Sequence, residues 1–217
     1  LLNTDIRKKR VMEETRWHFI RHAPVDNPEG RIYGASDQPA NITDIRSFSV
    51  LAQRLPVNAV SVTSHLMRTH QTLNAIENSG LKIKKPIIDE RLAEQDFGDW
   101  VGKTYDEAKA LFGEAYNRFW LAPVDEKPPN GESFLEVMDR VQNSICALTS
   151  RFKGKDIICI AHGGSIRAAL ALALNIKGEQ AISFSVENLS TTLIDYIHPE
   201  SNFKGGWRIR GTNIPPI

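Results

Sequence analysis

Short apolar runs alternate along the chain with longer stretches in which apolar residues recur every three or four positions. The runs predict buried strands, and the stretches predict helices that pack on a sheet. The predicted strands lie at residues 17–20, 59–63, 86–88 and 156–160. The predicted helices cover residues 43–55, 68–79, 104–119, 133–152 and 166–174. This alternation indicates an α/β fold in which helices connect the strands.

The run at 156–160 indicates how the sheet is covered. Its apolar residues are continuous, which is typical of a parallel strand with helices on both faces. Later strands, predicted at 182–186, 191–197 and 207–210, have no long helix between them. We therefore predict a three-layer α/β/α fold with a mostly parallel central sheet and an antiparallel edge.

Two long inserts, 24–43 and 90–131, interrupt this alternation. The first contains proline and glycine throughout, and the second ends in a loop rich in the same residues. Capping boxes mark the starts of two helices, Thr104 with Glu107 and Ser133 with Glu136. We expect the inserts to form a cap over the carboxyl ends of the strands.

The length of 217 residues suits one large α/β domain. Lys and Arg number 27 against 26 Asp and Glu, a net charge of +1, so no overall field attracts nucleic acid or a membrane. No apolar stretch is long enough to span a bilayer and no secretory signal is visible, so we interpret the protein as cytoplasmic. Residues 1–11 are polar and basic, and we expect an extension there, a natural start at Met12 and a single domain over 12–217.

Polar residues follow three of the predicted strands. Arg21 and His22 follow the first, Arg68 comes soon after the second, and His162 follows the strand at 156–160. Parallel neighbouring strands end at the same edge of a sheet, so these side chains are expected to converge. Arginine binds phosphate oxygens, and Gly163 lets a backbone N–H approach them. The sequence predicts a phosphate site here, the alternative being ordinary solvated strand ends.

Five segments in order resemble the motifs of the histidine phosphatase superfamily, also called phosphoglycerate-mutase-like, across about residues 17 to 197. They are Arg21-His22-Ala23, Ser64-His65-Leu66-Met67-Arg68-Thr69-His70-Gln71-Thr72, Leu92-Ala93-Glu94-Gln95-Asp96-Phe97-Gly98-Asp99-Trp100, Pro129-Asn130-Gly131-Glu132-Ser133 and Ala161-His162-Gly163-Gly164-Ser165-Ile166-Arg167. The resemblance implies that His22 is the nucleophile, which forms a phosphohistidine that water hydrolyses. It also implies that Arg21, Arg68 and His162 hold the phosphoryl group and that Glu94 is the proton donor.

The chain departs from the family pattern after the nucleophile. Ala23 and Pro24 stand where the family usually has Gly and Glu. Asn27 lies one position short of the place where the family often has a phosphate-contacting asparagine. Asn27 and Gly163 are candidate substrate-binding residues, together with Arg21 and Arg68.

The residue types support these roles independently. A neutral imidazole is needed to attack phosphorus, and nearby Arg21 and Arg68 disfavour the imidazolium, which predicts a pKa of His22 below about 6.5. The two arginines and His162 bring the positive charge that a metal would otherwise supply. We therefore predict neither a metal nor another cofactor.

The segment around Glu94 is similar to that of the phosphatases, and the chain lacks the longer insertion that mutases carry after it. We expect a metal-independent phosphomonoester hydrolase, with α-ribazole phosphatase as the more specific hypothesis. The alternatives are phosphoglycerate-mutase-type transfer and a phospho-ligand or phosphoprotein binding module with little turnover. The expected partner is a small phosphorylated metabolite, and the sequence also allows a homodimer. Candidate specificity residues are Arg31, Tyr33 and Trp100.

Overall fold

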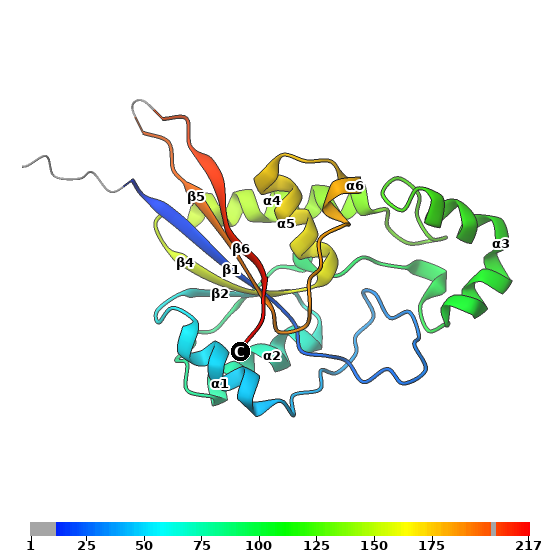
Figure 1. The fold of residues 1–217 in the computed structure, drawn as a ribbon, viewed down its shortest axis with the longest axis horizontal. Coiled ribbons are helices and arrows are strands. Elements are labelled where there is room, and N and C mark those ends of the chain that lie inside the picture. The colour runs from blue at the N-terminus through cyan, green and yellow to red at the C-terminus, as the bar shows by residue number, and fades with distance from the viewer. Residues whose placement is uncertain (1–11, 201–202) are drawn as a thin grey trace, which may run out of the picture.

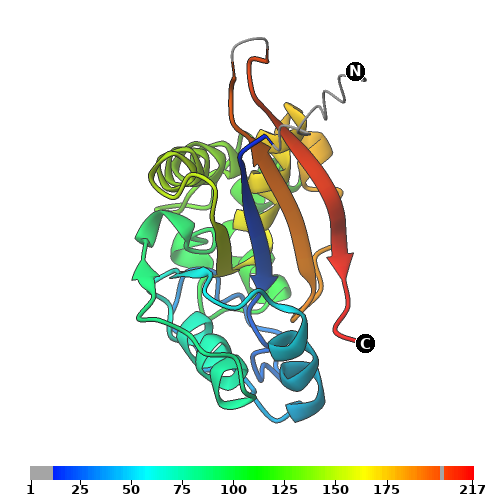
Figure 2. The same cartoon turned by 90° about the vertical axis from the view of Figure 1, so that its left-hand side faces the viewer.

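The computed structural model describes residues 12–200 and 203–217, so the expected extension at 1–11 lies outside the described residues. The described residues form a sheet of six strands in the order β3-β2-β4-β1-β5-β6 (Figures 1 and 2). The first four are parallel to one another, and β5 and β6 are added at the β1 side in antiparallel pairs. The strands are β1 (Glu14–Arg21), β2 (Val60–Thr63), β3 (Ile87–Ile88), β4 (Asp156–Ala161), β5 (Thr191–Ile197) and β6 (Gly206–Ile214).

Helices cover both faces of this sheet, which confirms the predicted three-layer fold (Figure 1). One face carries α1 (Ile45–Arg54) and α2 (Met67–Asn78). The other carries α4 (Phe134–Arg151), α5 (Gly163–Leu174) and α6 (Gly178–Ala181). Within the described ranges, no helix is both long enough and apolar enough to cross a membrane.

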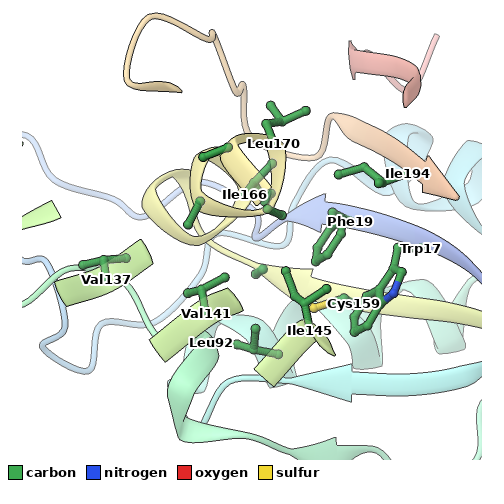
Figure 3. Packing of buried hydrophobic residues seen from close by; sticks show 14 of the residues in the cluster. Trp17, Phe19, Leu92, Val137, Val141, Ile145, Cys159, Ile166, Leu170 and Ile194 are labelled. Carbon is green, nitrogen blue, oxygen red and sulfur yellow. The ribbon is translucent and has the colours of Figure 1, made fainter. Parts of the chain in front are cut away.

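The larger apolar cluster lies between the sheet and helices α4 and α5 (Figure 3). Trp17 and Phe19 of β1 stack with their ring centroids 5.0 Å apart, and Val141 and Ile145 of α4 belong to the same cluster. Full burial of a side chain of this size stabilises the fold by roughly 1.5–3 kcal/mol. The strand that leads to His22 is therefore firmly anchored.

The position of β4 inside the sheet explains why its apolar residues are continuous. Ile157 and Cys159 belong to the cluster under α4 and α5, whereas Ile158 and Ile160 belong to the cluster under α1 and α2. Successive side chains of a strand point to opposite faces, so both faces of β4 are buried.

The prediction of a strand at 182–186 is wrong. These residues follow α6 as a turn and an irregular segment. The carbonyl oxygens of Phe184 and Val186 accept hydrogen bonds from the side chains of Arg167 and Arg21, and they do not pair with a neighbouring strand. Two arginines thus use the backbone groups that a strand would need.

The two inserts lie beyond the carboxyl ends of the strands, as predicted, and share a small apolar cluster (Figure 1). Trp100, in a short 3-10 helix (Gly98–Trp100), is buried together with Ile32 of the first insert and Phe119 of α3 (Tyr105–Leu121). A second 3-10 helix, Glu90–Leu92, opens the second insert. α3 bends at Gly113, whose φ of 39° lies in the left-handed region that favours glycine.

Candidate active site

The carboxyl ends of three adjacent parallel strands meet at one edge of the sheet. Arg21 of β1 lies beside Ala161 of β4, and Thr63 of β2 lies beside Ile160 of β4. The backbone N–H of His22 also donates to the carbonyl oxygen of Ala161 at 3.0 Å. The residues that follow these strands are therefore brought together, as the sequence predicts.

His22 is buried, and the backbone fixes one of its ring nitrogens. Its Nδ1 lies 2.7 Å from the carbonyl oxygen of Ala23. Because a carbonyl oxygen only accepts hydrogen bonds, the proton of the neutral ring is on Nδ1 and the lone pair is on Nε2. Burial, followed by the charges of Arg68 and Arg21, lowers the pKa of His22 to about 3. The ring is thus neutral near pH 7, with Nε2 available as a nucleophile.

Arg68 is fully buried and has no ion-pair partner within the described residues. Its Nη1 and Nη2 donate to the carbonyl oxygens of Ser36 and Gly34 at 2.8 and 2.7 Å. Its guanidinium carbon lies 5.3 Å from the ring centroid of Tyr33. Burial lowers the pKa of Arg68. A buried cation without a counter-ion costs free energy, so this arrangement is suited to binding an anion.

Arg21 and His162 add two further donors. Arg21 donates through Nη1 to the carbonyl oxygen of Val186 at 2.6 Å. His162 is buried, and its Nε2 lies 2.8 Å from Oγ of Ser64. When this hydroxyl donates to Nε2, the proton of the neutral ring is on Nδ1, which is then a donor. The ring centroids of His162 and His22 are 5.1 Å apart. Burial, then the neighbouring His22 and the arginines, lowers the pKa of His162 well below its usual value, so both imidazoles are neutral. The expectation that His162 brings positive charge is therefore wrong, and the charge of the site comes from the arginines.

Three buried nitrogen atoms at this edge have no hydrogen-bond partner among residues 12–200 and 203–217. They are Nε of Arg21, Nε of Arg68 and Nδ1 of His162. Buried polar groups in native proteins are nearly always hydrogen-bonded. A phosphoryl group offers acceptor oxygens, and its negative charge suits the two arginines. The donor set therefore fits a phosphoryl group beside His22.

Glu94 reaches the site from the second insert. Its Oε1 accepts hydrogen bonds from the backbone N–H groups of Gln95 and Gly164, both at 3.0 Å. Gly164 lies in the first turn of α5, so the carboxylate is at the positive end of the helix. A methyl group at Gly163 would lie 3.7 Å from Oε2 of Glu94 and 3.9 Å from Nε of Arg21. Oε1 is thus held in place, while Oε2 lies near the phosphoryl-binding donors.

Asn27 uses both ends of its amide within its own loop. Its Nδ2 donates to the carbonyl oxygen of Arg31 at 2.8 Å, and its Oδ1 accepts from the N–H of Arg31 at 3.0 Å. The side chain braces this turn at the wall of a cavity, and a contact with phosphate stays a prediction.

The candidate specificity residues differ in position. Tyr33 lines a cavity of about 530 Å³. Arg31 also lines it, with its charge paired to Glu29 and Glu107. Trp100 instead packs inside the cap. Within the described residues, no group of three or more His, Cys, Asp or Glu side chains could hold a metal ion.

The cavity lies on one side of this site. Glu94 and Gly164 belong to its lining, and aromatic residues form much of the rest. These aromatic residues are Tyr33, Phe97, Tyr105, Phe119, Trp120 and Phe134. Arg167 of α5 also lines the cavity. Sequence reasoning placed Arg167 in a motif but gave it no role, although its position three residues after Gly164 puts it on the same side of the helix.

Motifs, fold and site together define the class of protein. The sequence profile of the histidine phosphatase superfamily (branch 1) matches residues 17–209. The chain therefore belongs to this superfamily.

Two curated relatives show where the chain lies within it. A bifunctional protein of Mycobacterium tuberculosis is 31% identical over 166 residues, which cover 74% of this chain and 44% of the relative. The chain thus spans less than half the length of that protein. Phosphoserine phosphatase 1 of Hydrogenobacter thermophilus is 28% identical over 179 residues, which cover 81% of this chain and 84% of the relative.

Two solved structures share the fold along nearly their whole length. A mycobacterial glucosyl-3-phosphoglycerate phosphatase superposes with a TM-score of 0.76 at 25% identity, covering 93% of this chain and 99% of that one. The α-ribazole phosphatase of Shigella flexneri superposes with a TM-score of 0.75 at 20% identity, covering 93% of this chain and 98% of that one. At 20% identity the second likeness shows the fold alone.

Proposed function

We propose that this protein hydrolyses small phosphomonoesters through a phosphohistidine formed on His22, without a metal ion. The observation that carries the proposal is the hydrogen bond from Nδ1 of His22 to the carbonyl oxygen of Ala23. It leaves the lone pair on Nε2, in a neutral ring that lies next to three buried donors without partners. The phosphatase relatives support phosphatase activity.

In the first step, Nε2 of His22 forms a bond to phosphorus while the bond from phosphorus to the ester oxygen breaks. Nε of Arg21, Nε of Arg68 and Nδ1 of His162 donate hydrogen bonds to the phosphoryl oxygens and offset the developing charge. Glu94 gives its proton to the leaving oxygen, so the product departs as an alcohol.

In the second step, a water molecule attacks the phosphorus of the phosphohistidine. Glu94, now ionised, takes a proton from this water, and the bond from phosphorus to Nε2 breaks. His22 returns to its neutral form and inorganic phosphate leaves. The arginines supply the positive charge throughout, so no step of this scheme requires a metal.

The test is to trap the intermediate with the full chain. Protein treated with a chelator is mixed with a ³²P-labelled phosphomonoester and quenched within milliseconds. We expect label that is stable to base, labile to acid and located on His22 by peptide mapping. The variant His22→Ala should carry no label and have no turnover.

Other results would contradict the proposal. Label on a carboxylate, normal turnover by His22→Ala, or activity that chelation removes and magnesium restores would each exclude this mechanism. Transfer of the label to a second phosphorylated metabolite, without release of phosphate, would indicate mutase chemistry. Tight binding without label or turnover would indicate a binding module.

A further inference from the structure

Arg167 is a cation in the cavity wall that forms no ion pair among the described residues. The carboxylates of Glu94 and Glu187 act on its charge only from beyond ion-pair distance. Nε of Arg167 donates to the carbonyl oxygen of Phe184 at 2.8 Å, which fixes one edge of the guanidinium. Its two terminal nitrogens make neither a hydrogen bond nor an ion pair with any residue that the structure describes. The side chain is half-buried, and burial lowers the pKa of Arg167.

Arg167 lies close to the reacting groups. A methyl group at Gly163 would be 3.4 Å from Nη1 of Arg167, 3.7 Å from Oε2 of Glu94 and 3.9 Å from Nε of Arg21. The three groups therefore surround a single point. Arg167 is near enough to contact an atom only a few bonds from the ester oxygen.

The cavity shows on which side of the phosphoryl group Arg167 acts. Arg167 and the proton donor Glu94 both belong to the lining, whereas His22, Arg21 and His162 do not. A proton donor must lie on the side of the leaving group. Arg167 is therefore on the same side of the site as the leaving group.

The other arginine in the cavity lining provides a contrast. Nη1 of Arg31 lies 3.1 Å from Oε2 of Glu107, and Nη2 lies 2.5 Å from Oε2 of Glu29. Arg31 is thus already held in two ion pairs, while the terminal nitrogens of Arg167 are free to bind a ligand. A carboxylate that bound Arg167 would gain a charge-assisted hydrogen bond in a partly desolvated site.

We propose that Arg167 is a specificity-determining residue that binds an acidic group on the leaving group. The aromatic lining then contacts an apolar or ring-shaped part of the same leaving group. The substrate class is a phosphomonoester whose leaving group carries a carboxylate a few bonds from the ester oxygen. A volume of about 530 Å³ is within the range of small-molecule sites. The inference that this ligand is a substrate rests on the proposed function, but binding of the acidic group can be tested separately.

The experiment compares two phosphonates that cannot be hydrolysed. (3-Carboxybenzyl)phosphonate carries the acid, and (3-carbamoylbenzyl)phosphonate is its neutral counterpart of nearly equal size. Their affinities are measured by calorimetry for the wild type, Arg167→Gln and the matched control Arg31→Gln. For the wild type we expect the acid to bind about tenfold tighter or more, the usual effect of a hydrogen bond between charged groups. The preference should fall below about twofold in Arg167→Gln and persist in Arg31→Gln.

Several outcomes would overturn the inference. Equal affinities in the wild type would do so, as would an undiminished preference in Arg167→Gln or its loss in Arg31→Gln. If Arg167→Gln does not fold, Arg167→Lys serves instead and should keep part of the preference, since it keeps the charge but not the planar fork. Because the phosphonates do not turn over, an acid preference in a protein that forms no phosphohistidine would refute the proposed function alone. An active phosphatase without that preference would refute only the role of Arg167.

Discussion

At the scale of single residues, burial sets the protonation state of the nucleophile expected at His22. The sequence predicts a lowered pKa from the neighbouring arginines, and the direction agrees with the structure. The larger cause, however, is the burial of the ring, followed by Arg68 and then Arg21. A buried imidazole is neutral even before substrate binds, and the carbonyl of Ala23 selects its tautomer.

The role of Glu94 can be tested by comparing leaving groups. An alkoxide leaves poorly without a proton, whereas p-nitrophenolate leaves well without one. We expect Glu94→Gln to lower turnover of an alkyl phosphate by about 100-fold or more, the usual effect of losing a general acid. The loss on p-nitrophenyl phosphate should be much smaller, as long as release of phosphate from His22 does not limit both reactions.

Steady-state rates on the two substrates provide the measurement, with folding of the variant checked by thermal denaturation. Equal losses on both substrates would mean that Glu94 positions the phosphate or activates water. The acid would then be sought at Asp96 or Asp99, the other carboxylates of the same segment.

At the scale of elements, the first turn of α5 positions Glu94. The N–H of Gly164 donates to Oε1, and any Cβ at this position would collide with that same oxygen. We expect Gly164→Ala to displace the carboxylate and to lower turnover of an alkyl phosphate roughly 100-fold, because small misplacements of a catalytic group are costly.

A double-mutant cycle separates this effect from general damage. Alanine is favoured over glycine in a helix by about 1 kcal/mol, so the helix itself should not be weakened. When Gly164→Ala is added to Glu94→Gln, the further loss of rate should be small, because the acid has already been removed. Additive losses would show that Gly164 acts independently of Glu94.

Some elements could be predicted from the sequence and others could not. The helix starts at Thr104 and Ser133 follow from local capping patterns, and both capping boxes are present. The segment at 182–186 resembles a strand locally, yet its carbonyl groups bind two arginines. One of them, Arg21, is 165 positions away in the chain, a relation that no local pattern contains.

The candidate site shows a similar division. Each polar residue at a strand end could be named in advance, because parallel strands end at one edge of a sheet. Both ends of the Asn27 amide are hydrogen-bonded to the backbone of Arg31. These bonds depend on the path of a loop, which cannot be predicted from sequence periodicity. That Arg167 forms no ion pair likewise depends on how near to it the fold brings the carboxylates of Glu94 and Glu187.

At the scale of the whole molecule, the buried neutral histidines link folding to pH. The folded state holds the pKa of His22 at about 3, and that of His162 is also well below 6.5. The unfolded chain binds protons at these sites once the pH falls below about 6.5. Between those values the unfolded state holds more protons, so the free energy of unfolding falls as the pH falls. Each histidine contributes a slope of up to about 1.4 kcal/mol per pH unit.

Urea denaturation of the wild type and of His22→Gln between pH 7 and pH 4 measures this slope. The variant should lose less stability on acidification than the wild type, because one titrating group has been removed. Carboxylates contribute equally to both proteins and cancel in the difference. Parallel curves for the two proteins would show that His22 titrates alike in the folded and unfolded states.

The strand β1 has a further consequence for how the protein is made. β1 pairs with residues 156–161 on one side and 191–197 on the other, and the backbone of Arg21 is also bonded to residues 189 and 190. A ribosome adds about 5–20 residues each second, so β1 waits on the order of ten seconds before its second partner exists. A nascent chain that ends at residue 175 already contains every residue assigned to the chemistry. It would still be inactive, because the strand that positions His22 has no neighbour on one edge until residues 191–197 are synthesised.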